Sequence, residues 1–218
     1  MSFFKIEGIP GPGAKIYSLV VAQSPVMKDF YREVAKEVSS RVSSGKLLDI
    51  GTGPGYIPLD IARISPNLDV KAIDISPGMV SVANKNARDA GLTGRVEFKH
   101  GSAQHIPFSD NYFDLIMSTL SFHHWANPEA SFKEIHRALK PGGEAWIYEI
   151  RQDVPKEAKV QLKKSYGWFL AFLILYVVRL HSAVKLQRFQ ELHTLSELGF
   201  SKVEIEDRGI TLKLRLLK

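Results

Sequence analysis

The chain has 218 residues, of which 44% are hydrophobic and 24% charged, which is enough to bury one globular core. It contains no cysteine, which excludes disulfides, thiolate metal sites and cysteine nucleophiles and is consistent with a reducing compartment. A net charge of +6 suits either an ordinary basic surface or an anionic partner. We expect a single domain over 1–218. We also expect it in the cytoplasm, because residues 1–7 lack the basic start and long apolar core of a signal peptide.

The first helical pattern lies between Lys15 and Val42. Before it, the Gly- and Pro-rich residues 8–13 predict an irregular segment. Ser24 and Pro25 form an N-cap and first-turn signal in the middle of the pattern, so we expect two helices, the second from about Pro25 to Arg41.

Downstream, short apolar runs alternate with helical patterns, which predicts a parallel sheet. We expect strands at 46–50, 69–75, 96–99, 113–118 and 144–150, and helices at 56–65, 76–89 and 128–139, the last one stopping at the Lys-Pro-Gly-Gly turn 140–143. A helix at 186–198 and two strands at 201–206 and 210–217 follow, the strands joined by an Asp-Arg-Gly hairpin turn. The expected fold class is therefore α/β, with a mostly parallel seven-stranded sheet whose terminal strand is antiparallel.

The strongest chemical signal is an apolar strand that ends in Asp49 and opens into the alternate glycines Gly51, Gly53 and Gly55. Glycines allow a tight turn and a close approach of a ligand to the backbone amides. A dinucleotide-binding turn spaces its glycines differently, and Asp49 would repel a phosphate, so the loop suits a ligand that carries positive charge. Asp74, at the end of the second expected strand, can accept both hydroxyls of a ribose. The two acids together indicate a nucleoside that bears an ammonium group and no phosphates.

From about Asp49 to Ile150, and in the terminal hairpin, the sequence resembles the class I S-adenosylmethionine-dependent methyltransferases. The motifs that carry the resemblance are, in order, Asp49-x-Gly51-x-Gly53-x-Gly55, Asp74, the adenine segment 101–108, and the later motifs 113–116 and 139–143. The pattern is most similar to the small-molecule branch that includes the ubiquinone and menaquinone biosynthesis methyltransferases. The resemblance implies a Rossmann-like fold with a helical cap from residues 1–42 and 153–185, and methyl transfer to a small-molecule acceptor.

The resemblance also assigns an S-adenosyl-L-methionine site. The glycine loop would hold the methionine part, Asp74 with Ile75 the ribose, and Ser102 with Ala103 the adenine. Ser102 stands where the family usually has an acid, so its bond to the adenine amino group is weaker. The full set of expected cofactor residues is Tyr17, Asp49, Gly51, Thr52, Gly53, Gly55, Asp74, Ile75, Met79, Ser102, Ala103, Thr119 and Leu120. Tyr17 matches a tyrosine that approaches the cofactor carboxylate in the family, and it is equally compatible with core packing.

His123 and His124 follow the fourth expected strand, at the sheet edge where open α/β folds bind ligands. Methyl transfer requires an acceptor that is held close and aligned, and a neutral hydroxyl or a carbon acid also benefits from a base near neutral pH. The two histidines are therefore the candidate catalytic bases. A scaffold role, in which a ring bonds the loop backbone, is equally compatible. No close metal-ligand spacing is present, so no metal site is predicted.

Residues 153–185 interrupt the α/β alternation with a charged first half and an apolar second half. Residues 166–178 are 13 positions without a charge, fewer than the about 20 that span a bilayer. We expect a helix that covers the substrate with an apolar inner wall, which implies an apolar or aromatic acceptor. The basic flanks, with Trp168 and Tyr176, leave a peripheral membrane contact through 166–178 open. A dimer contact is also open, so a monomer or a homodimer is expected.

Two other classes of function compete with this interpretation. A nucleic-acid methyltransferase would use the positive charge, but residues 118–121 read Ser-Thr-Leu-Ser where that class carries an Asn/Asp-Pro-Pro-Tyr motif, so nucleic acid is not an expected partner. A non-catalytic S-adenosylmethionine-binding protein would keep the glycine loop and lack a pocket over the methyl group. The sequence leaves the acceptor atom open among oxygen, nitrogen, sulfur and carbon.

Overall fold

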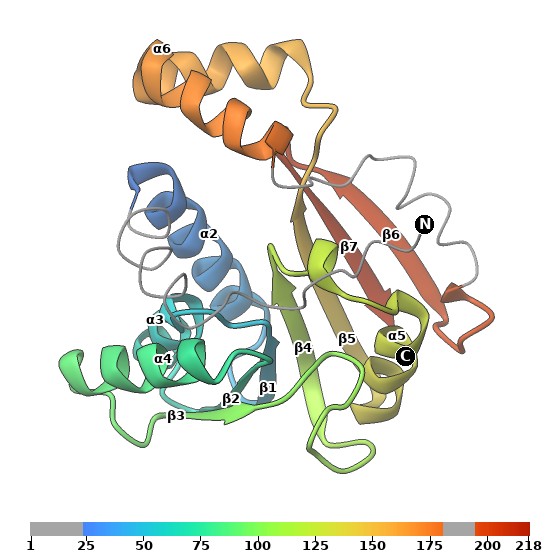
Figure 1. The fold of residues 1–218 in the computed structure, drawn as a ribbon. Helices are drawn as coiled ribbons and strands as arrows, with labels where there is room; N and C mark the ends of the chain where they lie inside the picture. The colour runs from blue at the N-terminus through green and yellow to red at the C-terminus, as the bar shows by residue number, and fades with distance from the viewer. Residues whose placement is uncertain (1–23, 181–194) are drawn as a thin grey trace.

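The computed structural model describes residues 24–180 and 195–218. Its strands are β1 (Gly45–Ile50), β2 (Leu68–Asp74), β3 (Val96–His100), β4 (Phe113–Thr119), β5 (Leu139–Ile150), β6 (Lys202–Asp207) and β7 (Thr211–Leu217). They form a seven-stranded sheet in the order β3-β2-β1-β4-β5-β7-β6 (Figure 1). All pairs among the first five strands in this order are parallel, and β7 is antiparallel to both of its neighbours, β5 and β6. The expected α/β class, with a mostly parallel sheet and an antiparallel last strand, is confirmed.

The helices are α2 (Pro25–Arg41), α3 (Tyr56–Ile64), α4 (Pro77–Asp89), the short 3-10 helix η2 (Phe122–His124), α5 (Pro128–Ala138) and α6 (Lys156–Leu180). Three of them begin within one residue of the predicted start. Their N-caps Ser24, Ser76 and Asn127 each accept a backbone N–H of the first turn through the side chain, and each precedes a proline. The predicted helix before Ser24, with Tyr17, lies outside the described residues. Of the helix predicted at 186–198 only the end is described, and residues 195–199 form a turn there.

Helices cover both faces of the sheet. On one face α2, α3 and α4 pack against alternate strand residues such as Leu47, Leu115 and Trp146. On the other face α5 packs against the intervening positions, for example Leu48 and Ile147. Figure 1 shows the two helical layers on either side of the strands. Because both faces are covered, the central strands are apolar on both sides, and the polar residues Asp49, Asp74 and Ser118 lie at their carboxyl ends.

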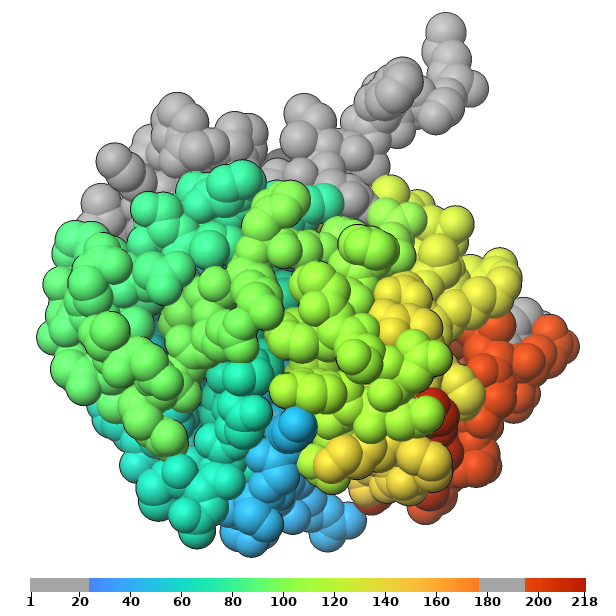
Figure 2. Space-filling model, turned by 90° about the horizontal axis from the view of Figure 1, so that it is seen from below, coloured from blue at the N-terminus to red at the C-terminus, as the bar shows by residue number. Residues whose placement is uncertain are grey.

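As predicted, the helix stops before residues 140–143, since α5 ends at Ala138, but β5 begins earlier than the predicted Glu144. The strand already begins at Leu139, which pairs with Phe113, and the register shifts between Phe113 and Leu115. The C-terminal residue completes this region, since Gly142 N donates to Lys218 O and Lys218 N donates to Gly143 O, both at 3.0 Å. Figure 2 shows this end of the molecule from below, where the red C-terminal atoms lie beside the yellow segment. Residues 140–143 therefore bulge out of the pairing with β4 and are held by the C-terminal residue.

The helix α6 crosses above α2 and the hairpin turn between β6 and β7 (Figure 1). Its backbone breaks at Gly167, whose φ of 80° and ψ of 161° are not helical, so α6 consists of two segments. Leu162 and Ala171 are buried against Val26 of α2. In residues 24–180 and 195–218, no helix combines the length and the apolar character needed to cross a bilayer.

Candidate functional site

The glycine loop folds over the carboxyl end of β2. The N–H groups of Gly51 and Thr52 both donate to Ile73 O, at 2.9 and 3.1 Å. Gly51 has a φ of 71°, and a Cβ there would lie 2.4 Å from the Oγ of Ser121, so the turn and the close approach both require glycine. Gly53 has a φ of 55° and no atom within 4 Å of an added Cβ, so its side-chain position faces open space. The loop therefore packs tightly against Ser121 at Gly51 and leaves open space beside Gly53.

Asp74 connects this loop to the start of α4. Its Oδ2 accepts the N–H of Gly53 and its Oδ1 accepts the N–H of Ser76, both at 2.8 Å. Burial raises the pKa of Asp74, against the effect of these two hydrogen bonds, which lower it. A carboxylate oxygen has more than one lone pair, so each oxygen can still accept a hydroxyl proton. The predicted ribose acid thus holds the loop in place and keeps acceptor capacity for a ligand.

Asp49 lies at the carboxyl end of β1 and is only 2% exposed. Burial raises its pKa to about 7, against the effect of the nearby Thr52 hydroxyl, which lowers it, and the negative charge of Asp74 adds to the rise. Its Oδ1 has no hydrogen-bond partner among the described residues. The same holds for the hydroxyls of Thr52, in the glycine loop, and Thr119, at the end of the neighbouring strand β4.

These three atoms indicate a binding site for a polar ligand at the carboxyl ends of β1 and β4. Buried polar side-chain atoms are rarely left without a partner. Within the described residues four such atoms occur, and only the hydroxyl of Ser39, in α2, lies away from this edge. A cation beside Asp49 would favour its ionised form. The donors and acceptors present therefore fit an S-adenosylmethionine molecule with its ammonium and ribose groups.

The turn after β4 is held against β1. Leu120 has a φ of 54°, unusual for a residue with a side chain, and its N–H donates to Tyr148 O at 2.8 Å. The Oγ of Ser121 donates to Ile50 O at 3.3 Å and accepts the indole N–H of Trp125 at 3.3 Å. Such strain persists where the surroundings fix it, which is common at ligand sites. The turn places η2, with both histidines, at the carboxyl edge.

His123 forms a pair with Glu149 of β5. The Nδ1 of His123 lies 3.0 Å from Glu149 Oε2, and the backbone N–H of His123 donates to the same oxygen at 3.1 Å. A carboxylate oxygen only accepts, so Nδ1 is the donor in this contact, which leaves Nε2 as the ring nitrogen that can bond to another group. The ring of His124 stacks obliquely beside it, with centroids 4.0 Å apart. The geometry matches a base oriented by an acid.

Glu149 was missed by the sequence analysis. It is 1% exposed, and its other oxygen accepts the N–H of Ile150 at 2.9 Å. The available signal was an acid within the apolar run of the fifth expected strand, next to its carboxyl end, which is the same signal that identified Asp49. Buried acids of this kind are functional-site candidates.

The remaining predicted residues lie around the neighbouring strands. The segment that contains Ser102 and Ala103 follows β3 and is joined to β2 by the N–H of Gly101, which donates to Asp74 O at 3.1 Å. Ile75 O lies 3.1 Å from the Nε2 of His100. The side chain of Met79 is buried in the first turn of α4. Within the part of the chain that the structure describes, no three His, Asp or Glu residues are grouped closely enough to hold a metal ion.

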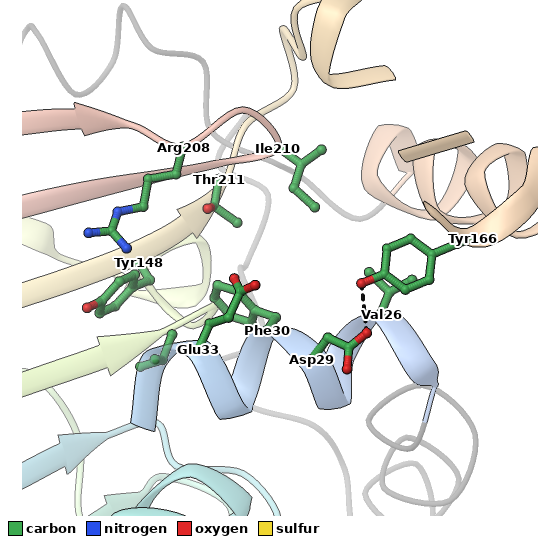
Figure 3. A pocket seen from close by; sticks show the side chains of 10 residues that line it. Val26, Asp29, Phe30, Glu33, Tyr148, Tyr166, Arg208, Ile210 and Thr211 are labelled. Carbon is green, nitrogen blue, oxygen red and sulfur yellow. Dashed lines mark hydrogen bonds between the residues drawn. The ribbon is translucent and has the colours of Figure 1, made fainter. Parts of the chain in front are cut away.

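A cavity of about 120 Å³ lies beside the end of β5, between α2, the β6–β7 turn and α6 (Figure 3). Aromatic side chains from three elements border it, namely Phe30, Tyr148 and Tyr166. The hydroxyl of Tyr166 donates to Asp29 at 2.9 Å, which fixes α6 to α2 on one side of the cavity. The cavity is small compared with drug-sized sites of about 300–1,000 Å³, so it suits one ring or a short chain.

Comparisons with known proteins agree on one family. A family model described as a methyltransferase domain matches residues 48–147. The ubiquinone/menaquinone biosynthesis C-methyltransferase UbiE of Saccharophagus degradans is 30% identical over 171 residues, covering 74% of this chain and 67% of the relative. The UbiE protein of Pseudomonas putida is 28% identical over 152 residues, and the match spans 59% of its length.

A solved structure covers the whole chain. The crystal structure of a proposed S-adenosyl-L-methionine-dependent methyltransferase from Methanococcus maripaludis superposes with a TM-score of 0.74 and 27% identity, covering 100% of this chain and 97% of that one. The similarity therefore includes the elements outside residues 48–147.

Proposed function

The chain belongs to the methyltransferase family, and from this premise we propose that it transfers a methyl group from S-adenosyl-L-methionine to a small, apolar or aromatic acceptor. The observation that carries the proposal is the polar edge of the sheet, where Asp74 holds the glycine loop beside the unpartnered oxygens of Asp49 and Thr119. When bound, the cofactor supplies a methyl group that its sulfonium makes electrophilic.

Each part of the proposed site has its own residues. We assign the methionine part to Asp49 and the glycine loop, since a buried carboxylate favours an ammonium neighbour. Asp74 and the adjoining Ile75 are assigned to the ribose. Ser102 and Ala103 are assigned to the adenine, and Thr119 with Leu120 to the opposite side. Tyr17 remains a proposal that lies outside the described residues.

In the proposed mechanism the protein mainly positions the acceptor and removes a proton. Displacement at a methyl group requires that the acceptor atom be close and aligned. The Nε2 of His123 takes the proton that the acceptor loses, and the Glu149 carboxylate stabilises the imidazolium that results. The hydrogen bonds of Ser121 to Ile50 and Trp125 fix the turn that holds His123 near the carboxyl ends of the strands.

An aromatic acceptor such as a quinol is the favoured substrate class. The observation that supports it is the named activity of the relatives, which is C-methylation in ubiquinone and menaquinone biosynthesis. A ring carbon is a poor nucleophile until a neighbouring hydroxyl loses its proton, which gives the His123–Glu149 pair a function.

Isothermal titration with S-adenosyl-L-methionine tests the cofactor site. Asp74→Ala removes charge-assisted acceptors, so binding is expected to weaken by about 10- to 100-fold. Asp69→Ala is the matched control, because Asp69 lies at the other end of the same strand and its side chain is exposed. Failure of the unchanged protein to bind the cofactor, or equal affinities for the two variants, would overturn the assignment.

A methyl-transfer screen with mass detection on quinols, phenols, thiols and amines identifies the acceptor class. With an active acceptor, His123→Gln should lower kcat by about 100-fold or more, and Glu149→Gln by about 10- to 100-fold with little change in KM. If both variants change only thermal stability and leave kcat intact, the pair is a scaffold.

A further inference from the structure

The second segment of α6 exposes a row of large apolar side chains. Trp168, Phe169, Phe172, Leu173 and Tyr176 have between 44% and 73% of their surface exposed. Their spacing places them on one side of a helix. We call these five residues the aromatic face of α6. Among the described residues only three other large hydrophobic side chains are exposed to this degree or nearly so, and they are scattered.

The opposite side of α6 is attached to the protein body. Ala171 is fully buried with Val26 and Leu162, and Leu170 and Ile174 pack partly against this cluster. The Tyr166–Asp29 hydrogen bond adds a polar contact to the same attachment. Because one side is fixed in this way, the aromatic face points away from the core.

Basic residues accompany the aromatic face. The first segment of α6 has one acid against four exposed lysines, which are Lys156, Lys159, Lys163 and Lys164. Lys163 and Lys164 lie just before the break at Gly167 that leads into the aromatic face. Apolar side chains with Trp and Tyr next to a lysine cluster are the composition that binds the headgroup region of an anionic bilayer.

We propose that the aromatic face of α6 docks the protein on the surface of an anionic membrane. A second copy of the chain is the less suitable occupant, because its adjoining segment carries the same four exposed lysines, whereas acidic lipids neutralise this charge. Tyr166, on the same helix, borders the cavity of Figure 3, so docking would bring that cavity near the lipid. The inference goes beyond the proposed activity and is tested without it.

Tryptophan fluorescence of the full chain provides a specific reporter. The sequence has three tryptophans, and Trp168 is 73% exposed, whereas Trp125 and Trp146 are 6% and 2% exposed. Vesicles of phosphatidylcholine with phosphatidylglycerol should shift the emission to the blue and co-sediment the protein. Vesicles of phosphatidylcholine alone should bind more weakly, and high salt should reduce binding to the anionic vesicles. Absence of any binding to the anionic vesicles would overturn the proposal.

Two double variants distinguish binding through the aromatic face from non-specific adsorption of exposed apolar side chains. Phe169→Ser with Phe172→Ser should lower partitioning into the anionic vesicles by at least about tenfold. The matched control, Ile64→Ser with Val203→Ser, removes exposed apolar side chains from α3 and β6 and should bind as the unchanged protein does. Titration with S-adenosyl-L-methionine should be unchanged in both, which separates a failure here from a failure of the proposed function. An equal loss of vesicle binding in both double variants would refute membrane docking. A dimer in solution that only the Phe169→Ser, Phe172→Ser variant dissociates would also refute it.

Discussion

Asp49→Asn is expected to stabilise the ligand-free protein at neutral pH and to weaken cofactor binding. The carboxyl group is buried, and burial raises its pKa from 3.8 to about 7. A group whose pKa is higher in the folded protein than in the unfolded chain binds protons better when folded. The folded state therefore loses stability as the pH rises from about 4 to about 7, and the loss is constant above that range.

The size of the effect follows from the shift. One pKa unit corresponds to about 1.4 kcal/mol, so the ionised carboxylate costs the ligand-free protein about 4 kcal/mol above pH 7. The amide that replaces the carboxyl group in the Asp49→Asn variant has no charge at any pH. The difference in unfolding free energy between the variant and the unchanged protein should thus be near zero at pH 4 and should grow toward that value by pH 8.

Urea unfolding at unit pH steps from 4 to 8 measures this difference. Asp69→Asn is the control, because its side chain is exposed and its difference should stay within about 0.5 kcal/mol at every pH. Titration calorimetry provides a second readout: below pH 7 the affinity for S-adenosyl-L-methionine should fall by about tenfold per pH unit, with proton release on binding, and Asp49→Asn should remove this dependence. A stability difference that does not vary with pH would refute the reasoning.

Three further substitutions test the loop and the contact between α2 and the hairpin. Gly51→Ala should destabilise the fold by about 2–3 kcal/mol, because the added Cβ is strained at φ 71° and lies 2.4 Å from the Oγ of Ser121. Gly53→Ala has a φ of 55° and open space around the added Cβ, so it should cost only about 1 kcal/mol and mainly weaken cofactor binding. Glu37→Gln should cost about 3 kcal/mol, because Glu37 accepts from Lys213 Nζ at 2.6 Å and Lys213 is only 3% exposed.

Urea unfolding and calorimetry measure these outcomes. The pair Gly51 and Gly53 is its own control, and equal losses of stability at the two positions would contradict the steric argument. Glu33→Gln is the control for Glu37, since Glu33 lies one turn earlier on α2 and is exposed, and it should change stability by less than about 0.5 kcal/mol. Equal losses for these two would show that the contact with Lys213 contributes little.

The parts of the fold that depend on local signals were predictable from the sequence. Ser24 and Ser76 cap helices where Ser followed by Pro indicated a start. The insertion of β7 between β5 and β6 was not predictable, because it depends on which strand edge is free once the sheet has formed. The start of β5 at Leu139 likewise depends on Phe113 and on the C-terminal Lys218.

The residues of the candidate site likewise include some that local signals predict and some that depend on tertiary contacts. Asp49 and Asp74 stand out locally, as acids at the ends of apolar strands followed by glycines or a helix cap. The pairing of Glu149 with His123 joins positions 26 apart through a turn whose shape depends on Ser121 and on β1. Residues 166–178 are apolar on every side, so the sequence could not show which side of α6 would be buried.

The alternation of side chains along the strands explains why the acids of the site have separate roles. Asp49 and Asp74 share strand parity with Leu47 and Val70, whose side chains pack under α2, α3 and α4. Glu149 shares parity with Ile147, which packs on the side of α5. The carboxyl edge thus carries the proposed cofactor acids on one side of the sheet and the acid that orients His123 on the other. An acceptor held at this edge would lie between a methyl donor and a proton acceptor, which is the arrangement that in-line transfer with proton removal requires.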